Sequence, residues 1–118
     1  MRVIEIRDYI DAKGRIPYRD WVAALDASAR VRVIAATLRM EQGNFGGAKS
    51  VGEGLSELRL DFGPGYRIYF GRDGERLVLL LGGGTKRRQQ SDITAALALW
   101  HEYKKGKKEA NDAADKKL

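Results

Sequence analysis

The chain has 118 residues, of which 32% are charged and 43% are hydrophobic, and this mixture is typical of one globular domain. A formal net charge of +6 favours anionic partners such as nucleic acid, and no apolar run approaches the roughly 20 residues that span a bilayer. Because there is no cysteine and His101 is the single histidine, thiolate and histidine-pair metal sites are excluded, and we expect neither a metal nor a cofactor.

The N-terminal part of the chain predicts one strand followed by a short helix. Residues 1–7 alternate apolar and charged side chains, a pattern that indicates a strand with one buried face. The same alternation lacks the apolar core of a secretory signal, so we expect the protein in the cytoplasm. Pro17 suits the first turn of the helix, where its missing N–H is not needed.

A second helix and a loop are predicted next. Asp26 or Ser28 can cap the helix through a side-chain oxygen. Its apolar stripe is expected from four residues at helical spacing, which are Val31, Ile34, Ala35 and Leu38. Residues 44–54 are rich in glycine and carry Lys49, and we predict a mobile connection there.

From residue 55 the hydrophobic period changes to two, which predicts a three-stranded antiparallel meander over residues 55–88. Residues 63–65, Gly-Pro-Gly, and residues 73–74, Asp-Gly, mark its two turns. Residues 77–81 are apolar at every position, as expected of a strand that is covered on both faces. We therefore predict that this strand is central.

The end of the meander at residues 63–65 is expected to gather basic side chains. A register that pairs Phe62 with Tyr66 would place two further pairs on the outer face, Asp61 with Arg67 and Arg59 with Tyr69. Lys86, Arg87 and Arg88 leave the last strand at this same end, just before a helix N-terminus that Ser91 or Asp92 can cap. These cations, with Tyr69 to stack on a base, could bind phosphate and RNA. From the residues alone, a plain ion pair between Arg67 and Asp61 remains equally open.

The order of elements predicts an α+β fold with a mostly antiparallel sheet, composed of an N-terminal strand, two helices and the meander, followed by a C-terminal helix. We place one domain over residues 1–105. Residues 106–118 are rich in lysine and poor in large apolar side chains, so we predict a disordered charged tail.

Several motifs, in this order, resemble the RelE/ParE toxin superfamily, close to its HigB branch and to the phage Gp49-like proteins. They are residues 54–59 (GLSELR), residues 62–70 (FGPGYRIYF) and residues 83–86 (GGTK), followed by Gln90, Asp92, Ile93 and Ala96. The similarity covers Met1 to about Tyr103. The resemblance implies a RelE-like fold and the toxin half of a type II toxin–antitoxin pair, with a helix-turn-helix antitoxin of the HigA kind as partner.

RelE-type members cut messenger RNA in the ribosomal A site without a metal, using the 2′-hydroxyl of the RNA as nucleophile. The resemblance implies that Arg67 contacts the scissile phosphate, that Arg87 is the arginine after the last strand, and that Arg59 replaces a strand lysine. Lys86, Arg88, Lys49 and Tyr69 are the expected RNA-binding residues. Glu57 stands where RelE has another lysine, and Ile93 falls about where RelE has its C-terminal tyrosine. Glu57 or Asp61 could then transfer protons.

Two other functional classes stay open. ParE-like members of the superfamily inhibit DNA gyrase and need no nuclease centre. A module that binds nucleic acid or a partner protein could also keep the fold without any catalytic activity. The sequence favours the metal-independent endoribonuclease, because the match at Arg67 and Arg87 coincides with the basic end of the meander.

Overall fold

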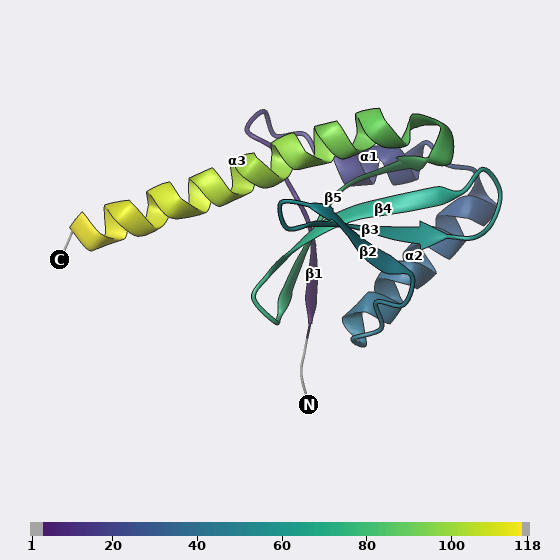
Figure 1. Cartoon of the computed structure of the whole chain (residues 1–118), viewed down its shortest axis with the longest axis horizontal. Coiled ribbons are helices and arrows are strands. Elements are labelled where there is room, and N and C mark those ends of the chain that lie inside the picture. Colours follow the sequence, from purple (N-terminus) through teal and green to yellow (C-terminus); the bar gives the residue numbers. More distant parts are fainter. Residues whose placement is uncertain (1–3, 117–118) are drawn as a thin grey trace.

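The computed structural model describes residues 4–116, which form one five-stranded mixed sheet in the order β1-β5-β4-β3-β2 with helices on both of its faces (Figure 1). The strands are β1 (Glu5–Asp8), β2 (Ala48–Gly52), β3 (Leu55–Leu60), β4 (Tyr66–Asp73) and β5 (Leu77–Thr85). The helical elements are α1 (Pro17–Ala23), α2 (Ala27–Glu41), the short 3-10 helix η1 (Lys86–Arg88) and α3 (Gln89–Lys116). The predicted α+β class, mostly antiparallel sheet and C-terminal helix are confirmed. Within residues 4–116, no helix is long and apolar enough to cross a membrane.

The N-terminal elements follow the local signals of the sequence. β1 pairs with β5 in parallel, from Glu5 opposite Leu77 to Asp8 opposite Leu80, while the first three residues of the predicted strand lie outside the described part. Pro17 is the first residue of α1, as predicted. The carboxylate of Asp26 accepts a hydrogen bond from the Ala29 N–H at 2.8 Å, so Asp26 caps α2.

The predicted apolar stripe of α2 is wrong. The residues that α2 buries are Ala29, Val33, Ala36 and Met40, whereas Val31, Ile34 and Leu38 are 66%, 46% and 51% exposed. Both sets recur at helical spacing, so periodicity alone could not choose between them. The small Ala29 and Ala36 allow the helix to lie close to the sheet, while Val33 and Met40 fill the space between.

The predicted mobile connection is also wrong in part, because it contains β2. This strand pairs antiparallel with β3, from Ala48 opposite Leu58 to Gly52 opposite Leu55. β2 forms the edge of the sheet, and it supplies β3 with backbone partners that β3 would otherwise lack. Lys49 therefore lies on a strand, directly opposite Glu57.

The register between β3 and β4 differs from the prediction by two residues. Leu60, rather than Phe62, pairs with Tyr66, and Arg59 lies opposite Arg67. The turn takes in residues 61–65, where the Gly65 N–H donates to the Phe62 carbonyl at 3.1 Å. Because side chains alternate with a period of two, a shift of two residues leaves every side chain on its predicted face.

Both faces of the sheet are covered, so Glu57, Arg67 and Tyr69 on the face predicted to be outer are buried. On one face α1 and α2 cover a core that includes Val33, Ile68, Phe70 and Leu80. On the other face, Ala96 and Trp100 of α3 pack in one cluster with Leu55, Tyr69, Leu79 and Leu81 of the sheet. Trp100 packs so closely on β4 that a Cβ at Gly71 would lie 2.4 Å from its ring. The prediction of a strand covered on both sides is confirmed for residues 78–81, and β5 lies inside the sheet between β1 and the middle strand β4.

Helix α3 continues well past the sheet. Its 28 residues span about 42 Å, and Figure 1 shows its C-terminal half projecting from the body of the protein. Residues 106–116, predicted to be disordered from their composition, continue this helix with exposed side chains. Extending an existing helix needs no new nucleation, and the alanines and lysines of this segment favour it. Whether the segment contributes to stability stays a prediction.

Candidate functional site

Arg67 lies at the centre of the predicted site, and it is buried. The residue is 4% exposed, its Nε donates to Glu57 Oε1 at 3.2 Å, and its Nη1 donates to the Gly65 carbonyl at 2.8 Å. The expected pair with Asp61 is not formed, because Asp61 binds Arg59 at 3.1 Å on the surface. Arg67 therefore meets a carboxylate inside the protein, and that carboxylate is Glu57.

Glu57 is held from two sides. Its side chain is completely buried, and its second oxygen accepts a hydrogen bond from Gln89 Nε2 at 2.8 Å. An isolated buried carboxylate is costly, and here the guanidinium of Arg67 balances the charge while the amide of Gln89 satisfies the other oxygen. The carboxylate thus joins β3, β4 and the first turn of α3.

Two oxygens beside this cluster have no hydrogen-bond partner among the described residues. They are the hydroxyl of Tyr69, which is fully buried, and Oδ2 of Asp92. Burial raises the pKa of the Tyr69 hydroxyl, and the charges of Glu57 and Asp92 raise it further. Burial also raises the pKa of Asp92, against the lowering effect of Arg88. Tyr69 has no exposed ring face in this structure, so base stacking on it requires α3 to move.

Asp92 sits against the backbone of β5. A Cβ at Gly84 would lie 1.8 Å from Asp92 Oδ2, so a side chain at position 84 would collide with the Asp92 carboxylate where it now lies. Asp92 and Ser91 do not cap α3, because the helix already begins at Gln89 after η1. The sequence analysis missed the roles of Gln89 and Gly84. Gly84 lies opposite Arg67 across the β4–β5 pairing, and a correct prediction of the register between these strands would have shown that the two residues are neighbours.

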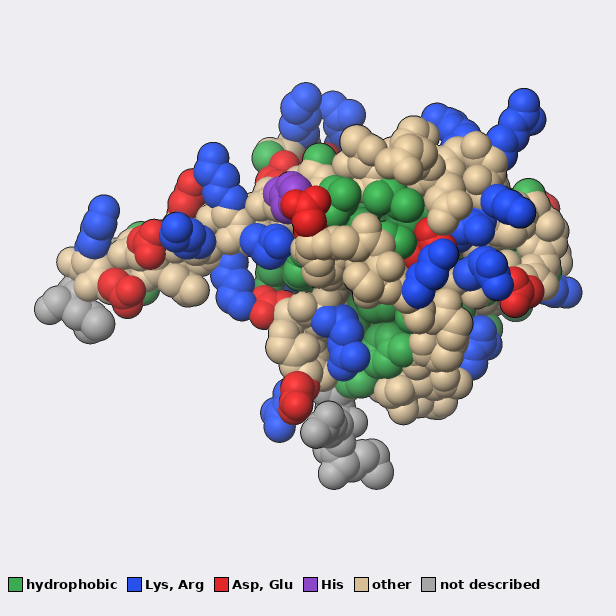
Figure 2. All heavy atoms as spheres, viewed as in Figure 1, with side chains coloured by type: hydrophobic (Ala, Val, Ile, Leu, Met, Phe, Trp, Pro, Cys, Tyr) green, Lys and Arg blue, Asp and Glu red, His purple; other side chains and the backbone are tan. Residues whose placement is uncertain are grey.

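The exposed cations lie beside this buried cluster. The Lys86 N–H donates to the Gly65 carbonyl at 3.1 Å, and the same carbonyl accepts from Arg67 Nη1. This shared oxygen confirms that η1 starts next to Arg67, and Lys86, Arg87 and Arg88 are all exposed. Figure 2 shows Lys and Arg side chains gathered over the end of the sheet where η1 and the β3–β4 turn lie.

Lys49 and Arg59 extend this basic end toward the edge of the sheet. Lys49 is opposite Glu57 and Arg59 is opposite Arg67, so all four project from the same face. Lys49 and Arg59 are exposed, and with Asp61 they line a hollow of about 320 Å³. The structure therefore brings the predicted cations to one end of the molecule, with Arg67 inside and the others outside.

This arrangement suits the binding of a phosphate-rich polymer. Exposed lysines and arginines neutralise phosphates, and the guanidinium forks of the exposed Arg87 and Arg88 can each donate two hydrogen bonds to one phosphate. The described residues contain no cluster of three or more His, Cys, Asp or Glu side chains that could hold a metal ion.

A family model described as phage-derived protein Gp49-like matches residues 20–113, which include the whole site. The chain belongs to the Gp49-like family. This Gp49-like protein is also 39% identical over 94 residues to an uncharacterized protein of Haemophilus influenzae, covering 79% of the chain and 95% of that relative. No solved structure matches it significantly. The Gp49-like family is associated with the toxins of toxin–antitoxin systems.

Proposed function

We propose that this Gp49-like protein is the toxin of a type II toxin–antitoxin pair, that it acts in the cytoplasm, and that it stops growth by cleaving messenger RNA on the ribosome. Its partner would be a helix-turn-helix antitoxin. The observation that carries the proposal is the junction at the Gly65 carbonyl, which holds Arg67 and the start of η1 together. The closeness of the buried Arg67 to the exposed Arg87 supports the proposal.

The proposed reaction needs no metal. The 2′-hydroxyl loses its proton and attacks the neighbouring phosphorus, the bond from phosphorus to the 5′-oxygen breaks, and that oxygen takes up a proton. A 2′,3′-cyclic phosphate and a 5′-hydroxyl result. Arg87 is exposed at the basic end and would stabilise the extra negative charge on the phosphorus centre. Arg67 would act indirectly, through the turn that its hydrogen bond to the Gly65 carbonyl anchors.

The proton acceptor in this scheme is Asp61 rather than Glu57. Glu57 is completely buried and already bound by Arg67 and Gln89. The Asp61 side chain is 83% exposed, and Arg59 holds it at 3.1 Å on the same basic end. A general base has to reach the hydroxyl it deprotonates, and Asp61 is the carboxylate that an RNA strand can reach.

The test uses Arg87→Ala, because Arg87 is exposed and its loss leaves no buried charge unpaired. We expect induced Arg87→Ala to lose growth inhibition by at least about tenfold while its circular dichroism spectrum stays unchanged. Arg76→Ala is the matched control, since it removes one exposed arginine from the opposite end of β5 and should stay toxic. Full toxicity of Arg87→Ala would refute the proposal.

One observation favours a second candidate. Arg67 is neutralised by Glu57, at the position where RelE has a lysine, so the centre of the site is closed in this structure. A ParE-like inhibitor of DNA gyrase would need no open centre. Separate measurements of new protein and new DNA after induction distinguish the two functions. An early stop in translation supports cleavage, whereas a supercoiling defect with continued translation supports gyrase inhibition.

A further inference from the structure

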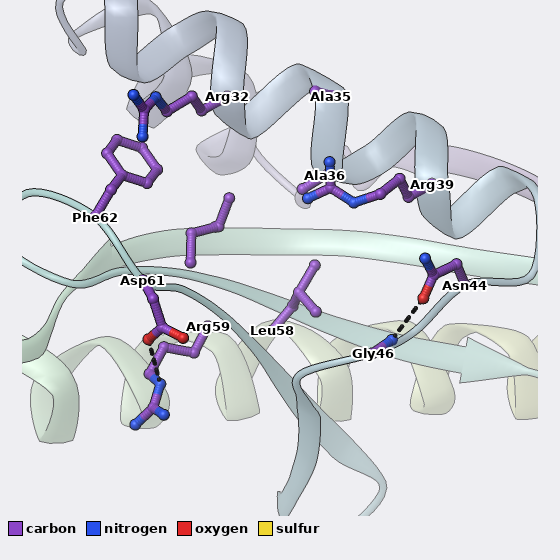
Figure 3. Close-up of a pocket in the computed structure, with 11 residues that line it drawn as sticks. Arg32, Ala35, Ala36, Arg39, Asn44, Gly46, Leu58, Arg59, Asp61 and Phe62 are labelled. Atoms are coloured by element: carbon purple, nitrogen blue, oxygen red, sulfur yellow. Dashed lines mark hydrogen bonds and ion pairs between the residues drawn. The ribbon is translucent and has the colours of Figure 1, made fainter.

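A second basic hollow lies between α2 and β3, away from the covered cluster of Glu57 and Arg67. We call it the α2–β3 hollow. It has a volume of about 420 Å³. The lining consists of residues 58–62 together with Arg32, Ala35, Ala36, Arg39, Asn44 and Gly46. This volume lies in the range of pockets that hold small organic ligands. Figure 3 shows Arg32 reaching from α2 to the Phe62 ring, and Arg39 lying along α2 beside Ala36, on the side of the helix that faces the strand.

The floor of the hollow is apolar and its rim is cationic. Ala35 and Ala36 of α2 and Leu58 and Leu60 of β3 form the apolar part. Such a surface suits a flat ring, and the rim above it suits an anion. A nucleotide combines these two properties, because its base is a flat ring and its phosphate is charged.

The rim has cations in excess. Arg32 lies over the Phe62 ring, 4.5 Å from its centroid, and this contact orients the guanidinium without neutralising it. Arg39 makes no side-chain hydrogen bond or ion pair with the described residues. The lining carboxylate, Asp61, is already bound by Arg59. Asn44 uses its Oδ1 to accept the Gly46 N–H at 3.0 Å, which leaves its amide N–H groups to donate.

The hollow is continuous with the basic end of the sheet. Arg59 and Asp61 line both this hollow and the smaller one that contains Lys49. Arg59 also lies opposite Arg67, one strand away, and neighbouring strands are about 4.8 Å apart. A single strand of RNA at η1 therefore has a cationic path around the sheet edge, from Arg59 to Arg39.

We propose that the α2–β3 hollow is a subsite for a nucleoside phosphate, with the base on the apolar floor and the phosphate on Arg39 and Asn44. The assignment of this ligand to RNA rests on the proposed function. A free nucleotide has the same chemistry, and the experiment below separates the two sources.

The experiment measures the dissociation constant of a fluorescein-labelled uridine octamer by anisotropy at several salt concentrations. Arg39→Ala should weaken binding about tenfold and reduce the salt slope by about 0.7, the value for one phosphate contact on a single strand. Ala35→Phe keeps every charge and fills the floor, and it should weaken binding about as much. Arg76→Ala, which removes the same charge from the far end of the sheet, should change the affinity less than twofold.

Uridine 5′-monophosphate, tested alone, identifies the source of the ligand. If it binds as tightly as the octamer and with the same dependence on Arg39, the subsite serves a free nucleotide; if it binds far more weakly, the subsite serves RNA. Equal losses in Arg39→Ala and Arg76→Ala, or full binding by Ala35→Phe, would overturn the subsite. The hollow and the adjoining exposed Val31, Ile34 and Leu38 would then be assigned to a protein partner.

The result of the octamer-binding experiment is independent of the proposed cleavage. Arg87→Ala tests toxicity at η1, whereas Arg39→Ala tests binding on the other side of β3. If Arg87→Ala stays toxic and Arg39→Ala still loses octamer binding, the cleavage proposal fails and the subsite stands. If Arg87→Ala loses toxicity and Arg39→Ala binds normally, the reverse holds.

Discussion

Arg59 and Arg67 face each other on neighbouring strands, yet their surroundings differ in nearly every respect. The Arg67 side chain is 5% exposed and its carboxylate partner is fully buried, whereas the Arg59 side chain is 56% exposed and pairs with an exposed carboxylate. Water screens the outer pair, so it contributes about 0–1 kcal/mol to stability. The inner pair cannot lose one member without leaving a charge inside the protein. Arg67 therefore serves the fold first, and contact with a substrate falls to the exposed arginines around it.

The largest expected effect comes from breaking the inner pair. Arg67→Ala leaves the Glu57 carboxylate buried with Gln89 alone, and we expect a loss of about 3–5 kcal/mol in the free energy of unfolding. Arg59→Ala should cost less than about 1 kcal/mol, because that pair is exposed. Urea denaturation measures both.

A second variant checks that the loss comes from the charge. Replacing both members, as Arg67→Met with Glu57→Leu, should recover most of the stability, because no buried charge is then left unpaired. Equal losses in Arg67→Ala and Arg59→Ala would contradict the contrast between the two pairs. Because Arg67→Ala is expected to destabilise the fold, loss of toxicity in this variant cannot by itself identify Arg67 as a catalytic residue.

The next effect concerns the contact that holds α3 over the inner pair. Gly84→Ala would place a methyl group 1.8 Å from Asp92 Oδ2, and we expect a loss of about 1–3 kcal/mol as the start of α3 is displaced. Adding Asp92→Ala should restore most of this loss. Gly106→Ala is the matched control, since nothing lies near that position and alanine favours a helix. If the double variant is no more stable than Gly84→Ala, the clash with Asp92 is not the cause.

The smallest effect concerns the projecting end of α3. Deleting residues 106–118 removes the ion pair between Lys107 and Asp73 at 2.6 Å, and we expect a loss below about 1 kcal/mol because the pair is partly exposed. Lys107→Ala in the full chain should show the same loss. A fall in melting temperature of ten degrees or more would show that this segment supports the domain.

The pH dependence of that loss has a defined sign. Hydrogen bonds from Lys107 and Tyr103 lower the pKa of Asp73 in the folded state. The stabilisation by Asp73 is therefore present above the pKa of the unfolded chain, about 3.9, and is lost as the pH falls through the lower folded value. Wild type and Lys107→Ala should converge in stability as the pH falls below about 4. A constant difference down to the lowest pH at which both fold would contradict the assignment.

The sequence was enough to predict the elements that local signals define. Pro17, the Asp26 cap and the period of two after residue 55 each have a local cause, and the structure confirms the elements they predicted. The exposed stripe of α2 could not be predicted, because its buried and exposed residues have the same spacing. The edge strand β2 was missed because its backbone partner, β3, is a tertiary feature.

At the site, the sequence predicted the cluster of cations but not which of them are buried and which are exposed. The faces of Arg59, Arg67 and Tyr69 followed from the period of two, and the two-residue error in register did not disturb them. Their burial depends on where α3 lies. α3 crosses the sheet above Tyr69, and the contacts of Gln89 with Glu57 and of Asp92 with Gly84 join residues whose closeness is a tertiary feature.

The most direct test of the account is the fate of messenger RNA in a reconstituted translation reaction with purified protein. We predict that the wild type produces fragments ending in a 2′,3′-cyclic phosphate. Arg87→Ala should leave the message intact, and Arg76→Ala should cut it as the wild type does. Intact message with the wild-type protein, or equal cutting by Arg87→Ala, would contradict the claim that the exposed arginines beside Arg67 carry out the cleavage.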